Sequence, residues 1–303
     1  MIRVENLTKK FAGITAVDDI SFKVDEGCIF GFLGPNGAGK TTTIRMLATL
    51  IKPTEGSIFV NGRTPSKDGE YIRSIIGILT ETPGMYEKIS ACANLDYFSS
   101  FYGIEEIRRK QNIEKFLKLF GLWDRRNDLV STYSKGMKQK LALARALIHE
   151  PKILFLDEPT AALDPESAFM VRSFIEQLKN DKTTVFLCTH NLEEASSLSD
   201  VVCIIKNRII KIATLEELQK NKKGSNTEVI MAQDASLFEQ VVKDTGLASN
   251  IAVENNRLAF SIESPEKSNP LIIKKLVNSG AEIIYINELK ASLEEIYLDL
   301  IKS

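Results

Sequence analysis

Cysteine and histidine are scarce in this sequence, with four cysteines and two histidines among 303 residues. The cysteines, at positions 28, 92, 188 and 203, are scattered, mostly within apolar runs, and no two form a C-x-x-C pair. A disulfide framework or a zinc module needs closely spaced cysteines, often with histidines. Free cysteine behaves as a small apolar residue, so we expect buried free thiols.

Long apolar runs and an excess of one charge are also missing. No stretch reaches the roughly 18 apolar residues of a membrane span, and the amino-terminal MIRVENLTKK lacks the apolar core of a signal peptide. We therefore expect a protein that is made and kept in the cytoplasm. With 39 basic and 40 acidic residues, the chain has no basic field for nucleic acid, and we expect no nucleic-acid partner.

Strand and helix patterns alternate before residue 214. The segments IRVENL, ISFKV, CIFGFLG and SIFVNGR are typical of strands, and Ile44, Leu47 and Ile51 have helical spacing that stops before Pro53. Residues 90–149 contain three successive helical patterns, after which strand patterns return at KILFLD, TTVFLC and VVCII. This order predicts an α/β fold with a mostly parallel sheet, helices on both faces, and an inserted helical block.

A polar, lysine-rich stretch near residues 214–226 indicates a helix followed by a linker. We place the domain boundary there, with one domain at 1–220 and a smaller one at 226–303. The element order β-α-β-β-α-β in the second domain predicts a ferredoxin-like α+β module. In its last helix the apolar residues share one face; they are Leu293, Ile296, Tyr297, Leu300 and Ile301.

The string GPNGAGKTT at residues 34–42 follows an apolar strand and opens a helix, which is the context of a phosphate-binding P-loop. Glycines let the backbone turn inward, so that successive N–H groups ring the phosphates at the positive end of the helix dipole. Lys40 should bridge the β- and γ-phosphates, and Thr41 should ligate Mg²⁺.

Two acids stand at the carboxyl end of the apolar strand KILFLDE, and a histidine stands at the end of FLCTH. Asp157 is placed to hold Mg²⁺ through water, while Glu158, one position on, points elsewhere and can take a proton from the attacking water. His190 can reach a γ-phosphate across the top of the sheet. His149 we interpret as a cap at a helix end.

The stretch YSKGMKQKLALARAL contains a second possible anion site. Ser134 begins a helix whose start presents free N–H groups and a hydroxyl, and whose apolar face includes Met137 and Leu141. An ordinary capped helix would have the same pattern. Because the P-loop already surrounds the nucleotide, this helix start is more useful when it points at the γ-phosphate of another copy.

The strings GPNGAGKTT, YSKGMKQKLALARAL, ILFLDEPT, AALD and TH, in this order and spacing, resemble the ATP-binding subunit of an ATP-binding cassette (ABC) transporter. Within that family the chain is most similar to the drug-resistance and export type with a small C-terminal extension. The resemblance covers residues 1 to about 220. It implies a P-loop NTPase cassette with a mixed sheet core, an antiparallel β subdomain and a helical subdomain at about 86–150.

The resemblance also implies a head-to-tail dimer and a role for each motif residue. Phe11 would stack on adenine. The phosphates would be bound by the P-loop residues Gly34, Pro35, Asn36, Gly37, Ala38, Gly39, Lys40, Thr41 and Thr42. The partner's γ-phosphate would be sensed by Ser134, Lys135, Gly136 and Met137, and Asp164 would tie the two sites together. Mg²⁺ would be served by Thr41, Glu81 and Asp157, and catalysis by Lys40, Glu158 and His190.

Two positions depart from the pattern of the family. Glu81 stands where the family usually has glutamine, so a carboxylate adds charge near the metal. Lys135 replaces a glycine of the usual Leu-Ser-Gly-Gly, which keeps the hydroxyl and one glycine but adds a cation. Lys135 either strengthens the anion site or faces water.

We expect an ATPase that uses ATP and Mg²⁺ and drives a separate membrane permease, with export as the direction that the resemblance implies. Its partners would be a second copy, or a second ATPase subunit, and the permease. The loop at residues 82–90, in which we expect Met85 and Tyr86 to be exposed, is our candidate for the permease contact. The protein would then lie peripherally on the cytoplasmic face of the membrane.

Two other classes share parts of this pattern. A soluble mechanochemical ATPase acting on DNA or ribosomes would need long coiled coils, zinc modules, a second cassette or basic surfaces, and none is visible. A GTP switch would need an Asn-Lys-x-Asp string, which NKKG at residues 221–224 does not provide. The C-terminal module either gates the dimer, senses a ligand, or adds dimer contact area.

Overall fold

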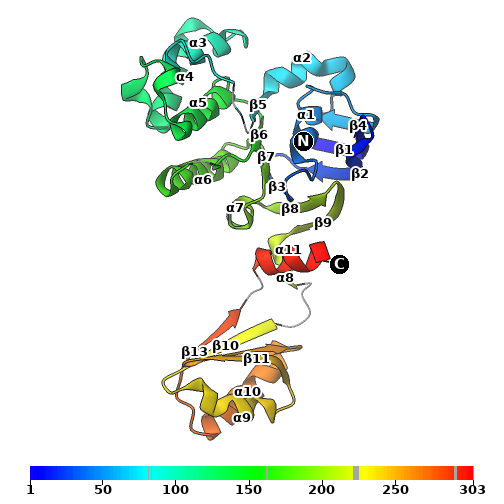
Figure 1. Cartoon of the computed structure of the whole chain (residues 1–303), viewed down its shortest axis with the longest axis vertical. Helices are drawn as coiled ribbons and strands as arrows, with labels where there is room; N and C mark the ends of the chain where they lie inside the picture. Colours follow the sequence, from blue (N-terminus) through cyan, green and yellow to red (C-terminus); the bar gives the residue numbers. More distant parts are fainter. Residues whose placement is uncertain (81, 83, 162, 221–224, 290–291, 303) are drawn as a thin grey trace. The chain divides into compact units, whose positions relative to one another are not determined.

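The computed structural model describes the chain except for residues 81, 83, 162, 221–224, 290–291 and 303. The chain forms two compact units, Met1–Thr214 and Leu215–Ser303 (Figure 1). This division falls a few residues before the expected linker, so helix α8 (Leu215–Lys220) belongs to the second unit. Within the described residues, no helix combines the length and the apolar character needed to cross a bilayer.

The first unit opens with an antiparallel sheet in the strand order β2-β1-β4. Its strands are β1 (Ile2–Phe11), β2 (Ile14–Val24) and β4 (Glu55–Val60). In β1 the buried residues Ile2 and Val4 alternate with exposed neighbours, as expected of a sheet with one covered face. That face packs against helix α1 (Lys40–Leu47), which follows the P-loop.

The main sheet has the strand order β5-β6-β7-β3-β8-β9, parallel from β5 to β8 and antiparallel at β9. Its strands are β3 (Ile29–Leu33), β5 (Ile76–Leu79), β6 (Ile153–Asp157), β7 (Thr184–Thr189), β8 (Val201–Lys206) and β9 (Arg208–Thr214). The mostly parallel sheet predicted from the sequence is therefore confirmed. The sequence analysis did not find the four-residue strand β5.

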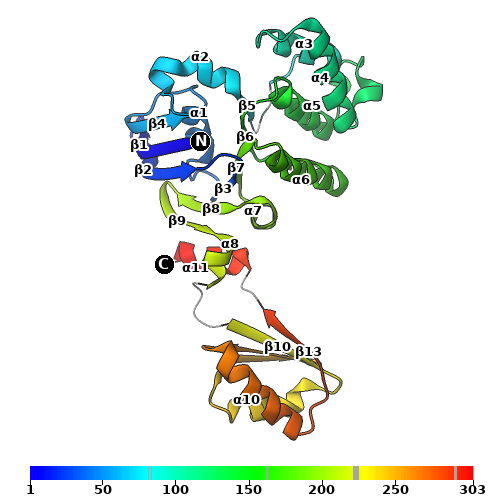
Figure 2. The same cartoon turned by 180° about the vertical axis from the view of Figure 1, so that it is seen from behind.

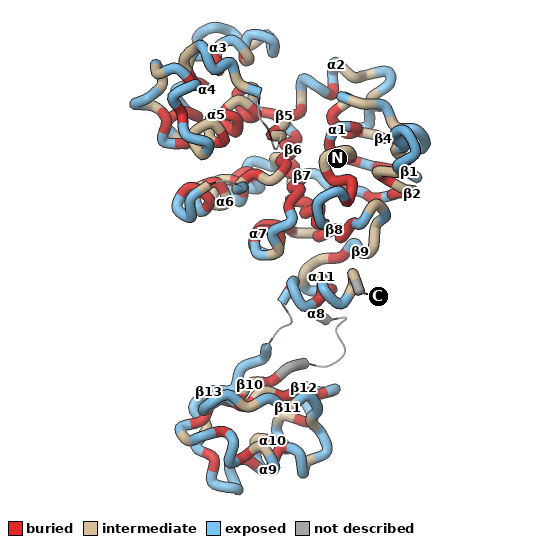
Figure 3. Tube along the Cα trace, in the orientation of Figure 1, coloured by how far each residue is buried: buried red, intermediate tan, exposed pale blue. Residues whose placement is uncertain are grey.

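Apolar side chains of the central strands fill both faces of the main sheet. In β6, Leu154 and Leu156 join the core cluster formed with the helical block, whereas Ile153 and Phe155 join the cluster formed with α1 and the antiparallel sheet. Figure 3 shows the trace of β6 and β7 as buried, in agreement with their fully buried residues. A strand covered on both sides explains the continuous apolar run in KILFLD.

The remaining helices of this unit are α2 (Pro65–Ile75), α3 (Ala91–Ser100), α4 (Glu106–Leu119), α5 (Lys135–Leu147), α6 (Pro165–Asn180) and α7 (Leu192–Leu198), with short 3₁₀ turns at Trp123–Arg125 and Val130–Thr132. Figures 1 and 2 show α3, α4 and α5 grouped together, apart from the antiparallel sheet. This group is the predicted helical block. The sequence analysis did not find α2.

The second unit contains an antiparallel sheet in the order β11-β12-β10-β13. Besides α8, its elements are β10 (Ser225–Met231), a 3₁₀ turn (Ala235–Phe238), α9 (Glu239–Lys243), β11 (Ala248–Glu254), β12 (Arg257–Ile262), α10 (Pro265–Asn278), β13 (Ile283–Leu289) and α11 (Leu293–Lys302). From β10 to β13 the order is the predicted β-α-β-β-α-β. In α11, Leu293 and Ile296 are buried.

All four cysteines are free thiols. Cys188 and Cys203 are buried in the main sheet, but Cys28 and Cys92 are only partly buried, so the expectation of burial is correct for two of the four. Burial raises the pKa of Cys28 to about 11, which leaves its thiol protonated at neutral pH.

Candidate active site

The P-loop connects the end of β3 to the start of α1. Gly39 precedes the helix with φ +95°, and a Cβ there would lie 2.5 Å from the carbonyl oxygen of Ala16. At Gly34 a Cβ would lie 2.3 Å from the carbonyl oxygen of Ile205. These two glycines are required because the loop passes so close to neighbouring backbone, which holds it in the curved shape that presents N–H groups inward.

Lys40 lies inside this loop and is only 6% exposed. Its Nζ donates to the carbonyl oxygens of Gly34 at 2.7 Å and Pro35 at 3.2 Å, and lies 3.8 Å from Glu158 Oε1. A buried ammonium needs such partners, because it has left water. The amine is therefore held at the centre of the loop, where the phosphates of a nucleotide would lie.

Thr41 and Asp157 bring two hard oxygen ligands together at the edge of the P-loop. The Thr41 hydroxyl donates to Asp157 Oδ2 at 2.7 Å, and Asp157, at the carboxyl end of β6, is 2% exposed. Mg²⁺ prefers oxygen ligands and is held in nucleotide sites by one or two protein groups together with phosphate oxygens. The pair therefore fits a Mg²⁺ ion.

Glu158 follows Asp157 with the left-handed backbone torsion φ +53°, which is unusual for a residue with a side chain. Its N–H donates to the carbonyl oxygen of Cys188 on β7 at 2.9 Å. Its carboxylate lies 2.8 Å from His190 Nδ1, through Oε1, and accepts from the Thr189 hydroxyl at 3.4 Å, through Oε2. The carboxylate thus faces His190 and Lys40, while Asp157 faces Thr41.

Phe11 stands at the end of β1, 45% exposed, and the Lys9 amine lies 4.8 Å from the centre of its ring. An exposed ring at the rim of a phosphate site can stack on a base. A pocket of about 600 Å³ joins this ring to the P-loop and the two acids. Its lining consists of Phe11, Ala16, Asn36, Gly37, Ala38, Gly39, Lys40, Thr41, Thr42, Asp157, Glu158, Ala161 and His190.

The other predicted site residues that the structure describes do not line this pocket. Ser134 begins α5 in the helical block, where its Oγ accepts from the N–H of Met137 at 3.2 Å, and Ser134 and Lys135 are exposed. Asp164 begins α6 and accepts from the N–H of Ser167 at 2.9 Å, and Ser167 lowers the pKa of its carboxyl. Glu81 lies outside the described residues.

Two polar residues that the sequence analysis did not single out, Gln139 and Glu194, contact the segment after Glu158. Gln139, buried on α5, donates through Nε2 to the carbonyl oxygens of Glu158 at 3.4 Å and Pro159 at 3.3 Å. On the other side, Thr160 Oγ1 donates to Glu194 Oε1 at 2.8 Å. A polar residue within a helix was the only signal for Gln139 and Glu194 in the sequence, and such residues are common.

His149 is not a simple helix cap. Its ring stacks on Tyr102 at 3.7 Å between centroids, and its Nε2 lies 2.9 Å from the carbonyl oxygen of Ile76. Burial lowers the pKa of His149 to about 4, so the ring is neutral at neutral pH. It holds the start of β5 against the helical block.

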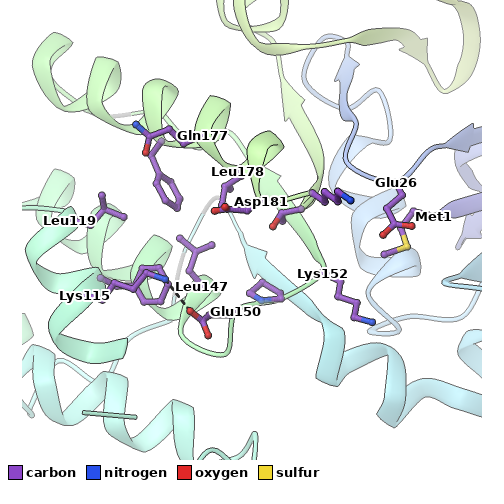
Figure 4. Close-up of a pocket in the computed structure, with 15 residues that line it drawn as sticks. Met1, Glu26, Lys115, Leu119, Leu147, Glu150, Lys152, Gln177, Leu178 and Asp181 are labelled. Atoms are coloured by element: carbon purple, nitrogen blue, oxygen red, sulfur yellow. Dashed lines mark hydrogen bonds and ion pairs between the residues drawn. The ribbon is translucent and has the colours of Figure 1, made fainter. Parts of the chain in front are cut away.

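A larger cleft, of about 780 Å³, lies at the opposite edge of the main sheet, where Lys152 precedes β6 and Thr183 precedes β7. Figure 4 shows Lys115 and Glu150 in its lining, joined by an ion pair of 2.9 Å between Nζ and Oε1. No predicted site residue that the structure describes lines this cleft. The candidate chemistry therefore lies at the carboxyl ends of the strands.

A glycine-rich loop closed around a lysine, a hydroxyl beside a carboxylate, and a second carboxylate beside a histidine define a P-loop nucleoside triphosphatase. Comparison with known proteins narrows this class. A family model described as "ABC transporter" matches residues 17–161. The chain is 34% identical over 305 residues to the uncharacterized ABC transporter ATP-binding protein YhcH of Bacillus subtilis (strain 168), covering 99% of this chain and 95% of the relative.

Two further comparisons agree. The daunorubicin resistance ATP-binding protein DrrA3 of Streptomyces coeruleorubidus is 32% identical over 302 residues, covering 99% of this chain and 95% of the relative. The dimeric structure of MJ0796, a bacterial ABC transporter cassette, matches with a TM-score of 0.65 and 26% identity, covering 71% of this chain and 98% of that chain. The chain belongs to the ATP-binding proteins of ABC transporters, and it is an ATPase.

Proposed function

We propose that this protein hydrolyses ATP between two copies of itself and thereby powers a separate membrane permease that exports its substrate. The observation that carries the proposal is the convergence of Lys40, Asp157, Glu158 and His190 on one pocket with the P-loop. The similarity to a daunorubicin resistance protein supports export. A protein that powers a permease in this way would lie on the cytoplasmic face of the membrane.

The chemistry follows from the positions of the side chains. Lys40 and the loop N–H groups would neutralise the phosphates, and Thr41 and Asp157 would hold Mg²⁺, which would supply further positive charge to the phosphates. Glu158 accepts a proton from the water that attacks the γ-phosphorus, and the bond to the leaving ADP oxygen breaks. His190 contacts Glu158 and extends to the open side of the pocket, where it can bind the γ-phosphate.

A second copy would complete the site. The start of α5, with Ser134 and Lys135, is exposed and lies off the pocket of its own chain, as does Asp164. Free N–H groups at a helix start bind anions, and Lys135 adds a positive charge to them. The dimeric structure of the MJ0796 cassette supports this arrangement. We place the α5 start of each copy over the nucleotide of the other.

The permease contact is proposed at an aromatic surface formed by the loop at residues 84–90 and α3. Tyr86 is 50% exposed, and its ring lies 5.1 Å from that of Tyr97 and 5.7 Å from that of Phe98. Phe101, 69% exposed, continues the row. An exposed apolar row of this kind fits the apolar face of a short helix.

The same loop is fastened to α5. Lys138 of α5 forms an ion pair with Glu87, and Arg145 of α5 donates to the carbonyl oxygen of Gly84. A displacement of the loop by a permease helix would therefore act directly on the helix whose start we place over the partner's nucleotide.

The test uses Glu158→Gln, which keeps the shape of the side chain and removes the base. We expect the purified variant to be dimeric in MgATP and monomeric in MgADP by light scattering. Lys40→Ala in the same background is the control, because it removes the charge that holds the triphosphate. A Glu158→Gln protein that stays monomeric in MgATP would contradict the proposal.

A further inference from the structure

Glu194, on α7, is a buried carboxyl that the catalytic scheme above does not use. It is 1% exposed, and it lies four residues after His190. Burial raises the pKa of Glu194; the hydroxyls of Thr189 and Thr160 oppose this rise, and the nearby Glu158 carboxylate adds to it. A carboxyl costs free energy when it leaves water, so its place in the fold needs a compensating contact.

One compensating contact, besides that of Thr189, comes from the segment that carries the proposed base. Thr160, two residues after Glu158, donates its hydroxyl hydrogen to Glu194 Oε1 at 2.8 Å. The carbonyl oxygen of Thr160 in turn accepts from the N–H of Leu163, just before Asp164. Glu194 therefore holds Thr160, whose carbonyl oxygen binds the residue next to Asp164, the residue proposed to contact the other copy.

The helix that carries Glu194 is also fixed to the histidine. Asn191 begins α7, and its Oδ1 accepts from the N–H of Glu194 at 3.1 Å. The N–H of Asn191 donates to Thr189 Oγ1 at 3.0 Å, so a hydrogen bond joins the two residues on either side of His190. Because only Asn191 separates His190 from α7, a displacement of Thr160 would move the histidine and the base relative to each other.

We propose that Glu194 and Thr160 form a positioning pair that sets the distance between Glu158 and His190 and, through the Thr160 carbonyl oxygen, the position of Leu163 just before Asp164. The pair contacts neither the P-loop nor Phe11, the residue proposed to stack on the base. We therefore expect it to affect the rate of hydrolysis and closure of the dimer rather than nucleotide binding. This inference rests on the proposed function, because it assigns the pair to that same site.

The first test is steady-state ATP hydrolysis by the full chain carrying Thr160→Val, which removes the hydroxyl with almost no change of shape. We expect kcat to fall by about tenfold to a hundredfold, the range for a small misplacement of catalytic groups, with KM for ATP nearly unchanged. Thr160→Ser, which restores a hydroxyl, should recover most of the activity. Glu194→Gln, which keeps an acceptor oxygen, should lose less activity than Glu194→Ala.

The matched control is Thr227→Val in the second unit, where a buried hydroxyl donates to Asn269 Oδ1 at 3.0 Å. It removes the same kind of hydrogen bond far from the site in sequence and in a separate unit, and it should leave kcat unchanged. A kcat for Thr160→Val equal to that of wild type, or a KM that rises in step with the fall in kcat, would overturn the positioning pair.

The second test separates this inference from the proposed function. In the Glu158→Gln background, adding Thr160→Val should raise the MgATP concentration needed for half-maximal dimerisation by about tenfold, whereas adding Thr227→Val should not. If Glu158→Gln alone fails to dimerise, the proposed function is wrong, and the kinetic test still decides the pair. If both double variants dimerise as Glu158→Gln does, the pair has no role in closure.

Discussion

The left-handed torsion at Glu158 predicts that a glycine variant there is more stable than an alanine variant, whereas at the neighbouring Asp157 the alanine variant should be the more stable. At Glu158, with φ +53°, we compare Glu158→Ala with Glu158→Gly. Both substitutions remove the carboxylate and its contacts, so they differ only in the Cβ. The same pair of substitutions at Asp157, which is in strand β6 and has no positive φ, provides the reference.

The magnitudes follow from two opposing terms. A left-handed torsion costs a residue with a Cβ about 1–2 kcal/mol, which glycine avoids. Glycine loses about 0.5–1 kcal/mol more than alanine through the greater freedom of the unfolded chain. The free energy of unfolding of Glu158→Gly should therefore exceed that of Glu158→Ala by about 0.5–1 kcal/mol. At Asp157 the glycine variant should be less stable than the alanine variant by about 0.5–1 kcal/mol.

Urea unfolding followed by tryptophan fluorescence measures this difference. The chain has one tryptophan, Trp123, which packs against the first core cluster, so the signal reports the first unit alone. The measurement needs no nucleotide. A Glu158→Gly protein that is less stable than Glu158→Ala, with the same order at Asp157, would refute the view that the backbone at Glu158 is strained.

Three further predictions address the metal, the permease and pH. Thr41→Val should raise the Mg²⁺ concentration for half-maximal hydrolysis about tenfold or more, measured by titration at saturating ATP, because the hydroxyl beside Asp157 is lost. Tyr86→Asp should abolish transport by the assembled system while hydrolysis by the isolated protein persists, and an equal loss of both would reject the permease contact. Because burial lowers the pKa of His149 to about 4 from 6.5, its contribution to stability is complete above pH 6.5 and is lost as pH falls toward 4. The difference in unfolding free energy between wild type and His149→Phe should therefore shift against wild type by about 2 kcal/mol between pH 7 and pH 4.5, and an unchanged difference would show that the ring is not kept neutral.

Local rules were sufficient to predict the P-loop between β3 and α1. Glycines next to a lysine and a hydroxyl residue, between an apolar strand and a helix, leave few alternatives for the backbone, and the structure has the expected loop with Lys40 inside it. The carboxyl ends of parallel strands meet at one edge, which is why Asp157 and His190 line one pocket although they are distant in sequence.

Short or weakly patterned segments were not predicted. Strand β5 has four residues, too few to show a period, and α2 begins with Pro65 and contains a non-helical residue at Asp68. The contacts of Gln139 and Glu194 depend on how α5 and α7 pack against the segment after Glu158. Nothing local to either helix distinguishes a glutamine or a glutamate that points inward from one that faces water.

These contacts also explain how the strain at Glu158 persists. A left-handed torsion is retained only where surrounding groups determine it more strongly than the residue itself prefers. Here the N–H of Glu158 is bound by β7 through Cys188, its carbonyl oxygen accepts from Gln139 of α5, and its carboxylate faces His190. Cys188 and His190 come from β7 and the residue directly after it, whereas Gln139 comes from α5, the helix whose start we place over the partner's nucleotide. A movement of α5 would therefore change the set of contacts that holds the base in its strained conformation, and so link closure of the dimer to the readiness of Glu158 for hydrolysis.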